Sequence, residues 1–181
     1  ASNRIVWDGN NRRLDTSRSD VGTAIQTQGD LTLAAGHDLN ATAANVVSSQ
    51  GALLVTAGNS VFLTAGQANQ TVDEAHRHKG RSGLFSSKTT TTRDTLDVTT
   101  ALGTTLSGKT ATVRANQDVR VVGSNVVSDS GTLLAAQNNL SIEAATNTTG
   151  ETHLKDERKS GIFSSGGIGL TMGTQQQSTD Q

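Results

Sequence analysis

The sequence contains no cysteine and no proline, and aromatic residues make up only 2% of it. Without cysteine, neither a disulfide scaffold nor a zinc–thiolate site is available. Without proline, every backbone N–H inside the chain can donate to a β-ladder, which long parallel sheets require. The shortage of aromatic residues leaves Val, Leu, Ile and Ala to fill the interior. Such side chains suit narrow stacked coils better than a broad globular core.

Strong net charge and long apolar runs are also absent. The formal net charge is −1 over 181 residues, so no global field would attract nucleic acid, and we expect no nucleic-acid partner. No run approaches the roughly 18 apolar residues of a membrane span, and the N-terminus lacks the basic-then-apolar order of a signal peptide. We therefore expect the chain to be an internal piece of a longer protein.

The chain contains a tandem duplication. The sequence NVVS at residues 45–48 recurs at residues 125–128, 80 positions later. The sequence SGLFSS at residues 82–87 recurs as SGIFSS at residues 160–165, 78 positions later. A repeat of this length indicates one structural unit that stacks on copies of itself.

The duplication predicts three segments: an N-terminal cap or boundary segment over residues 1–20, a first copy over residues 21–97 and a second copy over residues 98–181. The first segment is polar and charged around Trp7, the one tryptophan of the sequence. Two interpretations of it stay open. Trp7 either covers the unpaired strand edges of the first coil or belongs to a disordered end.

A shorter period of 22 residues lies inside the first copy. Leu31 and Leu33 are followed 22 positions later by Leu53 and Val55, and each short run alternates apolar and polar residues. Alternation on a strand directs one row of side chains inward and the other outward. One coil of such strands cannot bury its own inner face, so coils must stack. The sequence therefore predicts an all-β fold, a right-handed parallel β-helix of five or six coils.

The apolar positions of these runs predict the inner rows of the β-helix. We expect the inner rows to hold Leu31, Leu33, Leu39, Val61, Leu63, Val113, Val119, Val121, Leu140 and Ile142. A glycine or asparagine follows nearly every run, and both residue types tolerate a positive φ. Such residues mark the predicted corners Gly36, Asn45, Gly51, Gly58, Gly66, Asn116, Gly123, Asn125, Gly131 and Asn138.

The coil pattern stops once in each copy, over residues 71–94 and 147–174. Both stretches are charged and then continue in alternating residues. They predict two β-hairpin-like excursions, with turns at residues 80–83 and 166–167. Because most of a copy separates them, we expect the two excursions to lie a few coils apart.

Two stretches, GSNVVSDSGTLLAAQNNLSIEAAT at residues 123–146 and SGIFSSGGIGLTMG at residues 160–173, resemble the haemagglutinin repeats of filamentous haemagglutinin-like exoproteins. The excursion motif is most similar to the second repeat class in effectors of contact-dependent growth inhibition. The resemblance covers residues 21–181. The first copy departs from the pattern because it has four threonines at residues 89–92 where the second has GIGL.

Several functional expectations follow from this resemblance. It implies export by two-partner secretion and a location at the cell surface of a Gram-negative bacterium, as part of a stick that supports toxin delivery to a target cell. The partner would be the target cell's outer membrane or a surface receptor, and the outer-membrane secretion partner would act on another part of the protein. An adhesive stalk stays open as the alternative function.

Paired carboxylates could indicate an enzyme instead. Asp38 and Asp118 occupy equivalent positions in the two copies, and a polysaccharide-active solenoid would use carboxylates on neighbouring coils. The same positions suit corner residues whose side chains bond the local backbone. We expect the structural role, and therefore no enzyme and no small-molecule substrate.

No cofactor or metal site is expected either. His76 and His78 would share a strand face as half of a metal site, but a third ligand is missing nearby, and the flanking Arg77 and Lys79 repel a cation. The glycines of residues 167–173 do not fit a dinucleotide-binding loop, because the third glycine is one position late and no βαβ unit surrounds it.

The excursions hold the candidate contact residues for a partner or a membrane. Two of the three phenylalanines follow an aliphatic residue at the same repeated position in otherwise polar segments. In the first excursion, this pair is flanked by a basic cluster of Arg77, Lys79, Arg81 and Lys88. The candidates are Leu84, Phe85, Ile162, Phe163, Arg77, Lys79 and Arg81. The competing interpretation is that each Phe packs on the coil wall and that the basic residues form a solvated face.

Overall fold

The structure is a computed structural model that describes residues 2–83, 86–164 and 170–180, with side chains at all of these except 82–83, 162–164, 170–173 and 175. Each described regular element is a β-strand. The chain divides into two compact units, which are Ala1–Arg18 with Asn69–Val98 and Thr148–Gln181, and Ser19–Ala68 with Thr99–Asn147.

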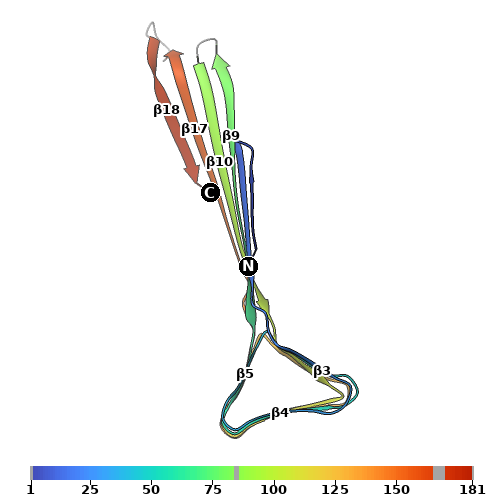
Figure 1. Ribbon diagram of the computed structural model, residues 1–181. Helices are drawn as coiled ribbons and strands as arrows, with labels where there is room; N and C mark the ends of the chain where they lie inside the picture. The colour runs from blue at the N-terminus through green and yellow to red at the C-terminus, as the bar shows by residue number, and fades with distance from the viewer. Residues whose placement is uncertain (1, 84–85, 165–169, 181) are drawn as a thin grey trace. The chain divides into compact units, whose positions relative to one another are not determined.

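The second unit consists of four successive coils of three short strands each, counted over the described residues. The coils are β3 (Ala24–Thr27), β4 (Leu31–Ala35) and β5 (Leu39–Thr42); β6 (Asn45–Ser48), β7 (Ala52–Ala57) and β8 (Val61–Thr64); β11 (Thr105–Gly108), β12 (Thr110–Ala115) and β13 (Val119–Val122); and β14 (Asn125–Ser128), β15 (Thr132–Ala136) and β16 (Leu140–Glu143). Figure 1 shows β3, β4 and β5 as three sides of a triangle.

Equivalent strands of successive coils pair in parallel and form three four-stranded sheets. Their orders are β14-β11-β6-β3, β15-β12-β7-β4 and β16-β13-β8-β5. Leu31 lies opposite Leu53, and Leu39 lies opposite Val61, so the step from the first coil to the second matches the 22-residue period. The predicted all-β architecture with parallel strands is confirmed.

The predicted number of coils is wrong. Over the described residues the structure has four coils rather than five or six. Residues 2–19, 66–83, 86–102, 148–164 and 170–180 supply the long strands of a separate antiparallel sheet, so less of the chain is left for coils. Each copy therefore contributes two coils.

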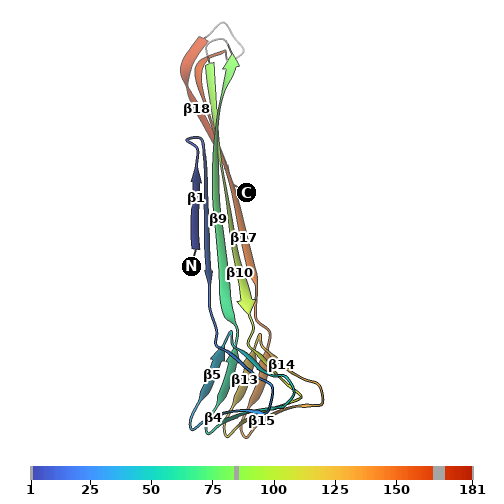
Figure 2. The ribbon, with the colours of Figure 1, turned by 45° about the vertical axis from the view of Figure 1, so that its right-hand side comes forward.

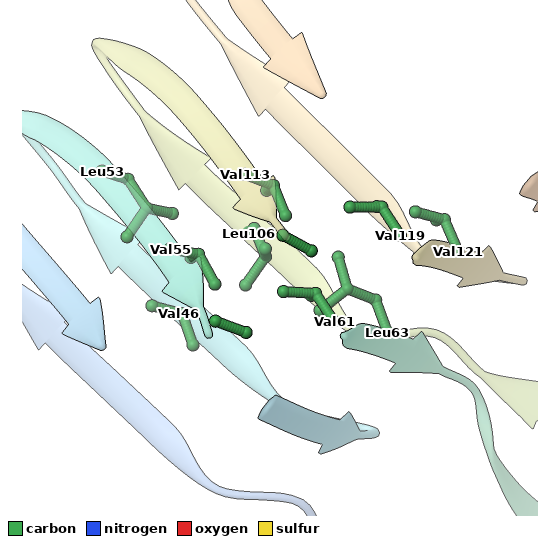
Figure 3. Close-up of a cluster of buried hydrophobic side chains, with 11 residues drawn as sticks. Val46, Leu53, Val55, Val61, Leu63, Leu106, Val113, Val119 and Val121 are labelled. Atoms are coloured by element: carbon green, nitrogen blue, oxygen red, sulfur yellow. The ribbon is translucent and has the colours of Figure 1, made fainter. Parts of the chain in front are cut away.

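Inward-facing residues of the two middle coils form the core. Figure 3 shows Val55, Val61 and Leu63 of the second coil close to Val113 and Val119 of the third. The predicted inner-row residues that are buried are Val61, Leu63, Val113, Val119 and Val121. Leu63 is 0% exposed, because strands on both sides of β8 cover its row. Burial of such a side chain is worth about 2 kcal/mol.

Inner-row residues of the two outer coils are less buried than predicted. Leu31, Leu33 and Leu39 are half-buried and pack against the core. Leu140 and Ile142 are 48% and 67% exposed, so their predicted burial is wrong. They do lie in the expected register, opposite Val119 and Val121, but β16 is the edge strand of its sheet and is covered on one side only.

The corner glycines act mainly through close approach of neighbouring coils. Among the predicted corner residues in the described chain, only Gly123 (φ +53) and Gly131 (φ +158) have a positive φ, and Ala43 (φ +51), which was not predicted, has one too. At Gly58 an added Cβ would collide with the carbonyl oxygen of Gly36, which lies 22 residues earlier. Glycine is needed there because two backbones are in contact.

The long strands form a six-stranded sheet, which we call the hairpin sheet. It consists of β1 (Ser2–Trp7), β2 (Asn11–Ser19), β9 (Gly66–Gly83), β10 (Ser86–Leu102), β17 (Thr148–Ser164) and β18 (Leu170–Asp180), in the order β1-β2-β9-β10-β17-β18. Strands β1 and β2 are antiparallel, with Trp7 opposite Arg12, and so are β17 and β18. Figure 2 shows these strands running side by side.

The N-terminal segment belongs to the hairpin sheet. Residues 2–19, for which a cap and a disordered end were both open, form β1, β2 and the turn between them. The division of the chain at residues 20 and 97 stays a prediction.

Candidate functional site

The two excursions are neighbours in the hairpin sheet. The expectation that they lie a few coils apart is wrong, because β10 of the first excursion pairs with β17 of the second. The Oγ atoms of Ser87 and Ser160 are 2.8 Å apart across this junction, and Lys88 Nζ lies 3.0 Å from Glu157 Oε1. Hydrogen bonding of long strand edges brings the excursions together, which a periodicity in sequence does not reveal.

The predicted hairpin form of the second excursion is confirmed by the antiparallel register of β17 and β18, in which Ser164 lies opposite Leu170. The turn predicted at residues 80–83 is wrong, since β9 continues through Gly83. The turn predicted at residues 166–167 lies outside the described residues.

The apolar candidate residues are only partly described. Leu84 and Phe85 lie outside the described residues. Ile162 and Phe163 belong to β17, with backbones opposite Met172 and Thr171. Their part in contacting a partner stays a prediction.

The basic candidates Arg77, Lys79 and Arg81 form a row on β9. All three side chains are exposed, and their spacing of two residues places them on one face of the strand. Within the described part of the chain, none of the three forms an ion pair. Among the described residues, the row is therefore a cationic surface without carboxylate partners.

Neighbouring charges are paired with one another. Lys88, which the sequence places in the basic cluster, binds Glu157 together with Lys159, whose Nζ lies 3.2 Å from the same oxygen. Hydrogen bonds from these two lysines hold the pKa of Glu157 below its ordinary value. Asp73 accepts two hydrogen bonds from Arg93, at 2.8 and 2.9 Å, which lowers the pKa of that carboxyl. These carboxylates are engaged elsewhere and do not offset the row on β9.

His153 is a titratable site that the sequence did not reveal. Its Nδ1 lies 2.8 Å from Asp94 Oδ1, and its Nε2 lies 3.9 Å from Glu151. The hydrogen bond to Asp94 raises the pKa of the imidazole. The partners are 59 residues apart in sequence, and only the pairing of β10 with β17 brings them together.

The side chain of His76 has two polar neighbours. Its Nδ1 lies 2.8 Å from Asn11 Oδ1, and its Nε2 lies 3.1 Å from Glu74. Over the described ranges, no group of three His, Asp or Glu residues is arranged to bind a metal ion.

Asp38 and Asp118 form a column of corner hydrogen bonds. Asp38 Oδ1 accepts from the Ser60 N–H at 3.0 Å and the Asn59 amide at 2.7 Å, both in the next coil. Asp118 Oδ1 likewise accepts from the Asn139 N–H at 3.1 Å. The expectation that these side chains bond the local backbone is wrong, because both carboxylates accept hydrogen bonds from the following coil. Both carboxylates link coils.

Comparisons with known proteins match this architecture of repeats. The family model described as hemagglutinin repeat matches residues 9–98 and 85–180. The chain belongs to the hemagglutinin repeat family. Its predicted resemblance to haemagglutinin-repeat exoproteins of contact-dependent growth inhibition is confirmed by the relatives below.

Three relatives of the chain are CdiA proteins. It is 39% identical over 92% of its length to the 16S rRNA endonuclease CdiA of Enterobacter cloacae subsp. cloacae, and 37% identical over 88% to a toxin CdiA of Escherichia coli. It is 36% identical over 78% to the tRNA nuclease CdiA of Escherichia coli strain STEC_O31. The chain spans only 5%, 5% and 4% of these relatives.

No solved structure matches the chain significantly. Among the described residues, none forms a helix of the length and hydropathy that crossing a membrane would need.

Proposed function

We propose that the chain is a non-enzymatic stick segment of a secreted two-partner-secretion exoprotein and supports toxin delivery to a target cell in contact-dependent growth inhibition. The observation that carries this proposal is the 39% identity over 92% of the chain to a stretch that makes up 5% of a 16S rRNA endonuclease CdiA. A segment so small beside a nuclease of that length fits a repeated structural role. The proposed location is the cell surface of a Gram-negative bacterium.

Two structural observations support a non-enzymatic stick. Asp38 and Asp118, the carboxylates that a polysaccharide-active solenoid would need, accept hydrogen bonds from the next coil. Equivalent strands stack in parallel along three sheets, which is how a rod grows by repetition. We propose a right-handed β-helix for this unit, since parallel strands joined by a crossover in one sheet are right-handed in about 98% of cases.

The proposed partner is the target cell's outer membrane or a receptor on it, contacted through the two excursions. Leu84 with Phe85 and Ile162 with Phe163 are an apolar pair that recurs at the same position of the repeated sequence motif. Burial of one Phe is worth about 2 kcal/mol, so two together support weak, reversible association.

The test is a pair of substitutions, Phe85→Ser with Phe163→Ser, in the full-length protein, with assays of secretion, binding to cells and toxin delivery. A matched control exchanges Val127→Ser with Leu133→Ser, two exposed apolar residues of the coils. We expect normal secretion and cell binding but lost delivery in the first variant only. Loss of cell binding would favour the adhesive stalk, and full delivery would overturn the contact role.

A further inference from the structure

The hairpin of β1 and β2 ends part-way along β9. Its turn is closed by the Asp8 N–H, which donates to the Asn11 carbonyl at 3.1 Å, and by the Asn11 N–H, which donates to Asp8 Oδ1 at 2.7 Å. Gly9 supplies the left-handed conformation that this turn needs, with φ +85. The hairpin therefore stops here for a local reason, and Figure 2 shows β9 running past it.

Beyond this turn, the edge of β9 is open. The Arg77 N–H donates to the Asn10 carbonyl at 2.8 Å, and β2 begins only at Asn11. On that side β2 is the sole strand paired with β9 over the described residues, whereas β9 continues to Gly83. Since alternate residues of a strand direct N–H and C=O to the same edge, those of Lys79 and Arg81 face the open side, as those of Arg77 do.

The open edge and the cationic row coincide. Lys79 and Arg81 present exposed side chains on one face of β9, continuing from Arg77, at intervals of about 6.7 Å. Gly80, between them, leaves the opposite face without a side chain, and a Cβ there would meet only His78 within 4 Å. An approaching strand would find open backbone groups and three cations without carboxylate partners among the described residues.

We propose that the open edge of β9 beyond the β1–β2 turn binds an acidic, extended polypeptide segment, which adds to the hairpin sheet as a strand next to β9. Its backbone would pair with Lys79 and Arg81, and Asp or Glu at alternate positions would face Arg77, Lys79 and Arg81. The edge offers carbonyl acceptors as well as N–H donors. Another backbone satisfies both, whereas a phosphate polymer would be repelled by the carbonyl oxygens. The inference does not depend on the delivery role.

The charge part is tested with a fluorescein-labelled peptide, Thr-Glu-Thr-Glu-Thr-Glu-Thr, and its lysine counterpart, Thr-Lys-Thr-Lys-Thr-Lys-Thr, titrated with the whole chain. The variant Arg77→Glu/Lys79→Glu/Arg81→Glu should weaken binding of the acidic peptide by about tenfold or more, as three exposed ion pairs would. The control Arg18→Glu/Lys109→Glu/Arg114→Glu changes the net charge equally and should bind like the parent. Equal loss in both variants, or no binding by the parent, would overturn the proposal.

The backbone part is tested at one residue. Lys79→Pro and Lys79→Gln both remove the charge, but only proline removes the N–H that faces the open edge, a change that edge strands tolerate. We expect the proline variant to bind more weakly than the glutamine variant. Should the proline variant melt below the parent, the acidic peptide N-methylated at alternate residues replaces it. Equal affinities in this comparison, or displacement by polyphosphate at equal charge concentration, would mean that charge alone binds and would overturn strand addition.

Discussion

Ser87 Oγ and Ser160 Oγ lie 2.8 Å apart, on β10 and β17. Ser87 is the last residue of SGLFSS, and Ser160 is the first residue of SGIFSS. The end of one motif therefore bonds the start of the next.

Paired cysteines test this junction. In Ser87→Cys/Ser160→Cys, the two thiols would replace hydroxyls in contact, so oxidation should form a disulfide within one chain, in a protein that otherwise has no cysteine. The control is Thr90→Cys/Ser160→Cys, in which the first cysteine points to the opposite face of β10. Gel mobility with and without reductant distinguishes them. Crosslinking of the control as fast as the test pair would contradict the register.

Core truncation should depend on the position of the coil. Leu63 is 0% exposed and Ile142 is 67% exposed, although both belong to inner rows. Leu63→Ala should lower the free energy of unfolding by about 2–5 kcal/mol, because it leaves a cavity. Ile142→Ala should cost less than about 1 kcal/mol. Urea unfolding followed by circular dichroism measures both, and similar midpoints for the two variants would disprove the burial pattern.

The corner carboxylates should tolerate an amide but not a methyl group. Asp118 Oδ1 accepts from the amides of Asn138 and Asn139 and from the Asn139 N–H. Asp118→Ala loses these bonds and should destabilise the chain by about 1–2 kcal/mol, whereas Asp118→Asn keeps an oxygen acceptor and should cost less than half of that. Asp129→Ala, at an exposed carboxylate, is the control for thermal melting. An alanine variant as stable as the asparagine variant would exclude the link between coils.

Stability should depend on pH through His153. Its pKa is raised by the hydrogen bond to Asp94, so the ion pair stabilises fully below the unfolded-state pKa of about 6.5 and is lost as pH rises through the raised folded-state pKa. The melting temperature of the parent should fall relative to His153→Gln over that range. An NMR titration of the ring should show the raised pKa in the parent and its return in Asp94→Asn. A midpoint at the ordinary value in the parent would rule the pair out.

The coils were predictable because their pairing is periodic. Leu31 opposite Leu53, and Leu39 opposite Val61, follow from a 22-residue repeat of alternating residues. Exposure of Ile142 was not predictable from the same pattern, since alternation shows which way a side chain points and not whether another coil covers it. The corner at Gly58 was recognised, but its cause, contact with the backbone of Gly36, depends on coil spacing.

The candidate site was less predictable. The basic row Arg77, Lys79 and Arg81 is visible as alternating residues in one strand. Its open edge is not, because that depends on where a hairpin of residues 2–19 stops beside β9. The pair His153 and Asp94 was also missed: antiparallel partners that are far apart in sequence leave no periodic signal, and each residue alone resembles a solvated charge.

Thr104 has a consequence for the order in which the chain folds. Its buried hydroxyl bonds the Thr64 carbonyl at 2.9 Å and accepts from the Ala44 N–H at 3.1 Å, which fastens the third coil to residues 40 and 60 positions earlier. Closing an open loop of that length costs chain entropy and slows folding. Pairing of β9 with β10, which ends at Leu102, shortens the loop that must still be closed before Thr104 can form its contacts. Each hairpin would then form before the next coil packs on the preceding one. A chain whose N-terminal end becomes available first would thus fold stepwise, without waiting for distant segments.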